Sequence, residues 1–128
     1  MLLQKNTART LVDTNVLLRY ILNDNPEMNQ KASEIMDGNV FTVPEVLAEV
    51  AYVMTKVYKA TREDTATYLA AIVEDVDIEH PLAVKEAIKI YADNNLDFVD
   101  CMLIAYNHID GTTVFTFDKK MNKLLKNS

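Results

Sequence analysis

Two aspartates in this sequence stand directly after short segments that have the composition of buried strands. Asp13 follows residues 10–12, and Asp118 follows residues 113–117. Because ligands of open parallel sheets bind outside the carboxyl ends of the strands, both aspartates are expected at the same edge of such a sheet. Carboxylates that converge repel one another unless a cation is bound, and ligand sets made only of oxygen favour hard ions such as Mg²⁺ or Mn²⁺. The chemistry that this pattern indicates is metal-assisted hydrolysis of a phosphodiester.

Two further acids are expected near the same edge. Asp100 precedes residues 101–105, which are apolar on every side and therefore predict a deeply buried helix. That helix leads into the last strand-like segment, so its first turn is expected at the carboxyl edge. Glu49 lies in the second turn of a helix that follows another short apolar run, residues 40–43. The sequence therefore predicts that four carboxylates, distant along the chain, meet in space.

Prolines and glycines indicate the elements that would position these acids. Pro26, Pro44 and Pro81 are expected in the first turns of helices, where the missing N–H group costs nothing. Gly38 and Gly111 are expected where helices end in a left-handed residue. Short strands separated by long helices imply crossover connections, and the expected fold is an α/β/α sandwich of three layers with a short parallel sheet. The strands are predicted over residues 10–12, 40–43, 76–79 and 113–117, with those at 40–43 and 113–117 buried, and the helices over residues 15–23, 26–37, 44–59, 62–75, 81–94, 97–110 and 118–126.

Length and composition limit the class of protein. The 128 residues fit one domain, residues 1–128, with residues 1–9 as a candidate flexible tail. No apolar run is long enough to span a membrane, and a single cysteine excludes an internal disulfide or a Cys-based zinc site. A cytoplasmic location is expected, since it is a reducing compartment. Cys101 itself is interpreted as a small core residue rather than a nucleophile.

The net charge of −6 argues against a broad basic surface for nucleic acid, although it leaves room for local ones. The lysines at the carboxyl end fit a solvated helix face as well as an RNA contact. The two basic clusters are Lys119, Lys120, Lys123 and Lys126, and Lys56, Lys59 and Arg62.

Simpler structural roles compete with the metal-site interpretation for every acid. Asp13 and Asp118 would each make an ordinary helix N-cap. Asp97 is interpreted first as the N-cap of its helix, with Asp100 as its partner in a capping pair and a supporting place at the site as a second role. Glu49 shares a polar stripe at helical spacing, which is typical of a solvated face. The other members of that stripe are Glu45, Tyr52 and Lys56.

Four blocks of sequence, taken together, resemble the PIN-domain proteins, and especially the VapC-type toxins of bacterial toxin–antitoxin pairs. The first block is residues 13–20, which begins Asp-Thr-Asn, and the second is residues 44–50, which contains Glu49. The third block is residues 96–105, and the fourth is residues 116–119. A single Asp-Thr-Asn would be weak, but the four blocks occur in the family's order and each falls on the expected element.

The resemblance implies a Rossmann-like α/β/α sandwich and endoribonuclease activity with one or two Mg²⁺ or Mn²⁺ ions. The family's acidic residues carry over to Asp13, Glu49, Asp100 and Asp118. In the mechanism that we expect, Asp13 and Asp100 are the principal metal ligands and Asp118 completes the site. Glu49 would bind the ion through water or position the attacking water. The resemblance also implies an RNA substrate, a homodimer, and a small antitoxin protein that lays a helix or tail into the groove and blocks the site. The supporting polar residues would be Thr14, Asn15, Asp97 and Thr116.

The sequence departs from the family in two ways and is compatible with three rival functions. The segment of residues 1–9 before the first strand and the negative net charge are both unusual for the family. The rivals are a PIN-like nuclease of RNA processing or of DNA that is not a toxin, a PIN-like module that binds RNA or protein with little catalysis, and a phosphotransfer domain. The last needs an acid pair after the first strand or an Asp-x-Asp motif, and residues 13–15 supply neither.

Overall fold

The chain alternates short parallel strands with helices in the computed structural model, which describes residues 8–22 and 25–126. The elements run in the order β1 (Thr10–Leu11), α1 (Thr14–Ile21), α2 (Pro26–Met36), β2 (Val40–Thr42), α3 (Pro44–Lys56), α4 (Arg62–Asp75), β3 (Asp77–Ile78), α5 (Pro81–Asp93), α6 (Phe98–Asp110) and α7 (Lys119–Leu124). Of the candidate tail at residues 1–9, residues 1–7 lie outside the described part of the chain. Arg9 is described, and its guanidinium lies 4.0 Å from the centre of the Phe41 ring.

The sheet has the strand order β1-β2-β3, and both pairings are parallel. Thr10 is opposite Val40, and Phe41 is opposite Asp77. The hydroxyl of Thr42, which is fully buried, donates to the carbonyl of Val12 at 3.1 Å, so a side chain ties the ends of the first two strands together. The prediction of an α/β fold with a short parallel sheet is confirmed.

Helix starts agree closely with the sequence predictions. All three prolines occupy first-turn positions, at the starts of α2, α3 and α5. Asn25 caps α2 by accepting from the backbone N–H of Met28 at 3.1 Å. These agreements have a local cause, because proline has no N–H to lose there and Asn satisfies an orphan donor of the first turn.

Helix ends agree less well. Gly111 is left-handed (φ 70°), as predicted, and its N–H bonds the carbonyl of Asn107 at 3.1 Å. The same prediction for Gly38 is wrong, because the last turn of α2 tightens instead, and the N–H of Gly38 bonds the carbonyl of Ile35 at 3.0 Å. The predicted helix 44–59 ends earlier, at Lys56, and the left-handed residue that follows is Lys59 (φ 58°) rather than a glycine.

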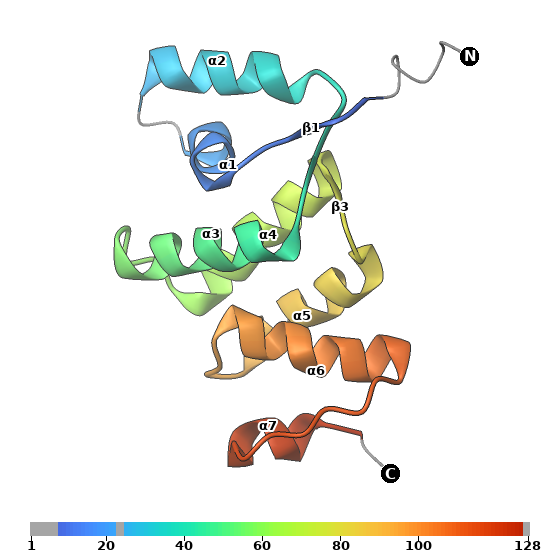
Figure 1. Ribbon diagram of the computed structural model, residues 1–128. Coiled ribbons are helices and arrows are strands. Elements are labelled where there is room, and N and C mark those ends of the chain that lie inside the picture. The colour runs from blue at the N-terminus through green and yellow to red at the C-terminus, as the bar shows by residue number, and fades with distance from the viewer. Residues whose placement is uncertain (1–7, 23–24, 127–128) are drawn as a thin grey trace, which may run out of the picture.

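The helices are stacked along one direction of the molecule (Figure 1). The pair α1 and α2 lies at one end, α3 and α4 lie in the middle, and α5 and α6 follow, with α7 beyond them. The largest helix interface is that between α5 and α6. No helix in the described ranges is long and apolar enough to cross a membrane.

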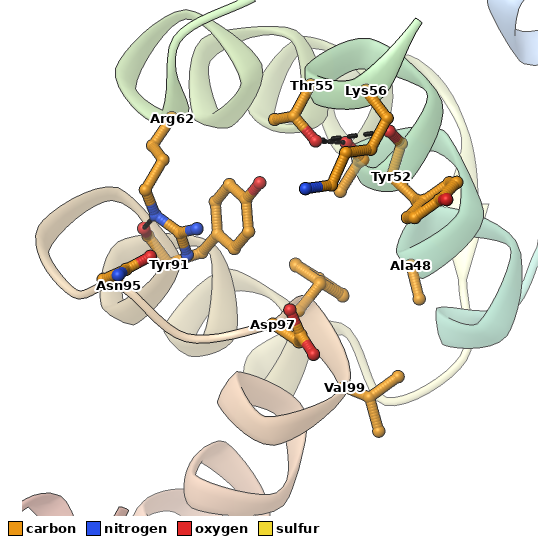
Figure 2. A pocket seen from close by; sticks show the side chains of 11 residues that line it. Ala48, Tyr52, Thr55, Lys56, Arg62, Tyr91, Asn95, Asp97 and Val99 are labelled. Atoms are coloured by element: carbon orange, nitrogen blue, oxygen red, sulfur yellow. Dashed lines mark hydrogen bonds between the residues drawn. The ribbon is translucent and has the colours of Figure 1, made fainter. Parts of the chain in front are cut away.

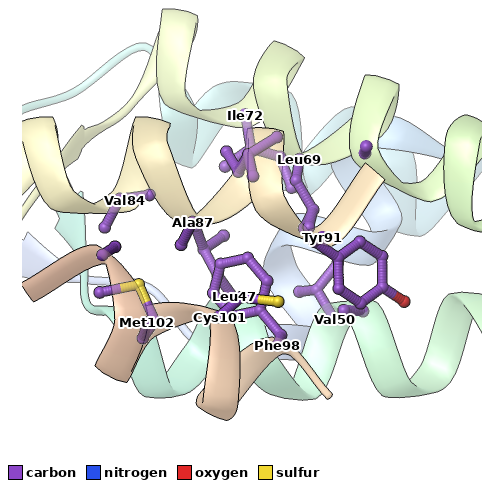
Figure 3. Close-up of a cluster of buried hydrophobic side chains, with 14 of the residues drawn as sticks. Leu47, Val50, Leu69, Ile72, Val84, Ala87, Tyr91, Phe98, Cys101 and Met102 are labelled. Atoms are coloured by element: carbon purple, nitrogen blue, oxygen red, sulfur yellow. The ribbon is translucent and has the colours of Figure 1, made fainter. Parts of the chain in front are cut away.

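The hydrophobic core lies between α3, α4, α5 and α6, as Figure 3 shows. The apolar residues of α3 recur at positions 47, 50, 51 and 54, which is one face of a helix, and all four are buried. Glu49 and Tyr52 are consequently turned away from the core. Cys101 is fully buried among these side chains, and burial raises the pKa of its thiol to about 12, which confirms its interpretation as a core residue.

One predicted element is absent. Residues 113–117 form no strand in the described chain, and Phe115 and Phe117 are 82% and 90% exposed. The prediction of a buried strand there is wrong, because no described strand pairs with this segment, and side chains bond the backbone at and just before it. The amide of Asn107 donates to the carbonyl of Thr112 at 2.8 Å, and the amide of Asn122 donates to the carbonyl of Thr116 at 2.9 Å.

Candidate active site

The starts of α1 and α3 bring two of the predicted acidic positions together. Asp13 caps α1, and its Oδ1 accepts from the backbone N–H of Val16 at 3.1 Å. The next residue, Thr14, is buried, and its hydroxyl donates to Oε1 of Glu49 at 2.5 Å. The parallel pairing of β1 with β2 explains this contact, since each strand delivers its helix to the same edge of the sheet. Glu49 is exposed, as a solvated face would require, but its carboxylate also accepts a hydrogen bond from a buried side chain of another helix.

A second acidic group forms around the first turn of α6. Asp100 is partly buried there, and burial, followed by the charges of Asp97 and then Asp118, raises the pKa of its carboxyl. Negative charge on Asp100 is thus disfavoured by its surroundings. A cation placed among the three carboxylates would reverse that preference.

Asp97 and Asp118 both occupy N-cap positions, but they use them differently. Asp118 caps α7, and its Oδ1 accepts from the backbone N–H of Met121 at 2.9 Å. Asp97 precedes α6, but its side chain makes no capping hydrogen bond. The interpretation of Asp97 as a capping side chain is therefore wrong, because its carboxylate points toward an adjoining cavity instead of toward the helix (Figure 2).

The remaining supporting residues lie in different places. The hydroxyl of Thr116 accepts from the backbone N–H of Asp118 at 3.0 Å and so shapes the loop that carries this acid. Asn15 is exposed in the first turn of α1, where it lines a separate hollow beside α2 together with Arg19 and Met28.

The described side chains thus form two acidic groups, one at the starts of α1 and α3 and one at the start of α6. Within residues 8–22 and 25–126, no three Asp, Glu, His or Cys side chains stand close enough together to hold a metal ion. Asp118 approaches Asp100 from the loop before α7, and not from the end of a strand paired with β1. Convergence of all four carboxylates on one ion stays a prediction.

A cavity of about 410 Å³ adjoins the second acidic group and was not anticipated from the sequence. Arg62 forms one wall. Its guanidinium lies 3.8 Å from the centre of the Tyr91 ring and donates to the carbonyls of Tyr91, at 3.1 Å, and Leu96. The proposed basic cluster around Lys56 is therefore only partly available to a ligand, because Arg62 is engaged within the protein. The polar stripe on α3 is the sequence feature that could have indicated this cavity, because its members Tyr52 and Lys56 line it.

Known proteins resemble the chain along almost all of its length. The family model for the PIN domain matches residues 10–126. A VapC ribonuclease of Aquifex aeolicus (strain VF5) is 27% identical over 127 residues, which covers 89% of this chain and 90% of that protein. No solved structure gives a significant match.

Proposed function

The chain belongs to the PIN domain family, and from this membership we propose that it is a divalent-metal-dependent endoribonuclease that acts as the toxin of a toxin–antitoxin pair. The similarity to a VapC ribonuclease over most of both chains supports the activity and the toxin role. The observation that carries the proposal is Asp100, which is partly buried in the first turn of α6 and whose carboxyl pKa is raised by burial and by the charges of Asp97 and Asp118. Such a group is poorly suited to a structural role, because its charge is destabilised unless a cation joins it.

The donor set fits a hard divalent ion in its chemistry. The four acids Asp13, Glu49, Asp100 and Asp118 offer only oxygen, which Mg²⁺ and Mn²⁺ prefer. When bound, one or two such ions would activate water and stabilise the charge that develops on the leaving oxygen of a phosphodiester. Because the acids stand in two groups, binding requires the start of α6 to approach the starts of α1 and α3.

The protein's own residues have distinct roles in this proposal. Asp13 and Asp100 hold the ion, with Asp118 as a further ligand. Glu49 is oriented by the Thr14 hydroxyl, which leaves its second carboxylate oxygen to accept a proton from the attacking water. Thr116 fixes the backbone before Asp118 through its bond to the N–H of that residue.

Cleavage of a mixed RNA pool tests the activity. The wild-type protein should cleave RNA in Mg²⁺ or Mn²⁺ and stop when EDTA is added, and Asp100→Asn, purified identically, should lose at least about 100-fold in rate. Asp64→Asn is the matched control, because Asp64 is an exposed acid in the first turn of α4 and belongs to neither acidic group. Cleavage that survives Asp100→Asn or EDTA would reject the proposal, and RNA binding without cleavage would favour a binding module.

The proposed partners are an RNA substrate, a small antitoxin protein and a second copy of the chain, all in the cytoplasm. The exposed rings of Phe115 and Phe117 lie against each other at 5.1 Å between centroids, and they are the most exposed large apolar side chains in the described chain. Because a protein interface would remove these two rings from water, we propose that they contribute to the dimer contact. Sedimentation of the wild-type protein beside Phe115→Ser/Phe117→Ser tests this, and a dimer that persists in the double variant would refute that placement.

A further inference from the structure

Resting on the proposed function, we propose that the cavity beside α3 is a nucleotide subsite, which holds one base and one phosphate of single-stranded RNA next to the cleaved bond. The cavity lies between α3, the start of α4, the loop between α5 and α6, and the first turn of α6 (Figure 2). Its volume of about 410 Å³ falls in the range of small-molecule sites, roughly 300–1,000 Å³, and is enough for one nucleotide.

Two walls of the cavity are formed by elements that also carry the acidic groups, namely α3 and the first turn of α6. On α3, Tyr52 is three residues after Glu49 and Lys56 is seven residues after it, so all three side chains share one face of the helix. On the opposite wall, Asp97 lines the cavity and its charge acts on Asp100. A chain of RNA that occupied this cavity would therefore have its next phosphate at the acids.

Tyr52 supplies a surface on which a base can stack. Its ring is 62% exposed at the cavity, on the face of α3 opposite the core, and no described residue bonds its hydroxyl. Stacking on aromatic side chains is the usual means of holding unpaired bases, and it requires a base that is free of its own duplex. The class of ligand is therefore a single strand.

Lys56 supplies the contact to a phosphate. It is exposed, forms no ion pair with any described residue, and its amino group points into the cavity (Figure 2). Arg62 cannot serve in this way, because its guanidinium is held by two backbone carbonyls and the Tyr91 ring. It acts as a rigid wall instead.

The charges around the cavity also orient the strand. Lys56 and Asp97 lie on opposite walls, so a phosphate is attracted to the α3 side and repelled from the α6 side in the absence of a metal ion. Asn95 lies at the same cavity and is exposed, so its amide can donate to and accept from the edge of a base.

Binding of RNA in a variant that does not cleave tests the subsite. In an Asp100→Asn background, the affinity for a fluorescein-labelled single-stranded RNA of mixed sequence is measured by anisotropy over a range of salt concentrations. Tyr52→Ala should weaken binding about 5- to 100-fold, and Tyr52→Phe should retain it, because stacking needs only the ring. Lys56→Gln should reduce the slope of log affinity against log salt by about 0.7, the value for one phosphate contact on a single strand. Lys56→Arg should keep the slope.

Two control variants make the same chemical changes at residues outside the cavity. Tyr68→Ala removes a partly exposed tyrosine of α4, and Lys89→Gln removes an exposed lysine of α5, and neither residue lines the cavity. Both should bind RNA as the background does.

The outcomes separate the subsite from the proposed function. Wild-type cleavage of RNA, combined with unchanged binding in Tyr52→Ala and Lys56→Gln, would leave the nuclease intact and overturn the subsite. Weakened binding in these variants without any wild-type cleavage would keep the subsite and reject the nuclease. The subsite is also overturned if the Asp100→Asn protein does not bind RNA. The same conclusion follows if Tyr52→Ala and Lys56→Gln bind RNA normally and are impaired only in binding another protein.

Discussion

At the scale of single residues, Thr14 is the side chain that joins two acidic positions. It is buried, and its hydroxyl contacts a glutamate that is 35 positions away in the sequence. The hydrogen bond fixes one carboxylate oxygen of Glu49 and so selects which oxygen remains for chemistry. Thr14 is thus a positioning residue, which acts through Glu49.

Replacing Thr14 by Val should lower the rate of RNA cleavage about tenfold, because the shape is kept while the hydroxyl is lost and Glu49 is no longer oriented. The free energy of unfolding should fall by only about 1 kcal/mol, the usual value of one hydrogen bond. Steady-state cleavage assays and urea unfolding measure the two effects. Thr14→Ser, which keeps the hydroxyl, should restore most of the rate, and failure to do so would contradict the role.

Asp100 leads to a prediction about stability and pH. Its pKa is raised in the folded protein above the ordinary aspartate value of 3.8. Because the folded protein binds this proton more tightly than the unfolded chain does, the protonated carboxyl favours the fold. That contribution to the free energy of unfolding is complete below the unfolded pKa and is lost as the pH rises through the raised folded pKa. In EDTA at pH 7, Asp100→Asn should therefore raise Tm by about 1–3 °C over the wild type.

The same comparison below pH 3.8 is the internal control, because the wild-type carboxyl is then protonated in both states and the difference in Tm should shrink. Asp64→Asn should show no such pH-dependent gain. A Tm of Asp100→Asn that falls below that of the wild type at pH 7 would show that the carboxylate stabilises the metal-free fold.

The sequence could predict single residues where the interaction is local. The capping contacts of Asp13 and Asp118 each join residues three apart, and both agree with the N-cap roles expected from the sequence. The bond between Thr14 and Glu49 was not anticipated, because it depends on how two helices leave two paired strands. The free carboxylate of Asp97 was missed for a similar reason, since a local capping role looked sufficient.

At the scale of elements, Arg62 connects three segments. It is the first residue of α4, and its guanidinium holds the carbonyl at the end of α5 and the carbonyl of Leu96 in the loop before α6. That loop leads into Asp97 and Asp100, so the position of the second acidic group depends on this arginine.

Arg62→Ala should lower the free energy of unfolding by about 2–4 kcal/mol, because two backbone carbonyls lose a charged donor and Tyr91 loses its stacked cation. Arg62→Lys should recover little, since an ammonium cannot reproduce the planar fork. Chemical denaturation measures both. Arg9→Ala is the control, as it removes an exposed guanidinium from the ring of Phe41, and a similar cost in both alanine variants would refute the special role of Arg62.

Elements were predictable where one pattern decided them. Long amphipathic runs that begin at proline specified α3 and α5, and alternating short apolar runs specified a parallel sheet. Residues 113–117 show the limit of such a pattern. Their composition favours a strand, but a strand also needs a neighbour. In the described chain no strand pairs with this segment, and side chains of α6 and α7 bond the backbone at Thr112, just before it, and at Thr116.

At the scale of the whole molecule, metal binding and folding should be coupled. The acids that we assign to the ion come from α1, α3, α6 and the loop before α7, so an ion shared among them joins both ends of the stack of helices. The assignment of residues 1–128 to one domain was made from the chain length and stays a prediction.

Mn²⁺ should raise the thermal stability of the protein in proportion to its occupancy. At a free concentration about 100 times Kd, the stabilisation is about 2.7 kcal/mol. Calorimetry or a dye-based melting assay should record a higher Tm, which EDTA reverses and which both Asp13→Asn and Asp100→Asn abolish. The Asp64→Asn control should respond like the wild type, and a response that survives either acidic-site variant would place the ion elsewhere.

The exposed aromatic pair between α6 and α7 has a consequence for the lifetime of the protein. In a monomer, where no second copy covers this pair, proteases of chymotrypsin specificity should cut after Phe115 or Phe117, which are the most exposed large aromatic residues in the described chain. A nick there would sever the peptide link between Asp118 and α6 while the core between α3 and α6 stays folded. Such cleavage would separate Asp118 from the other acids and so end RNA cleavage, while the core stays folded.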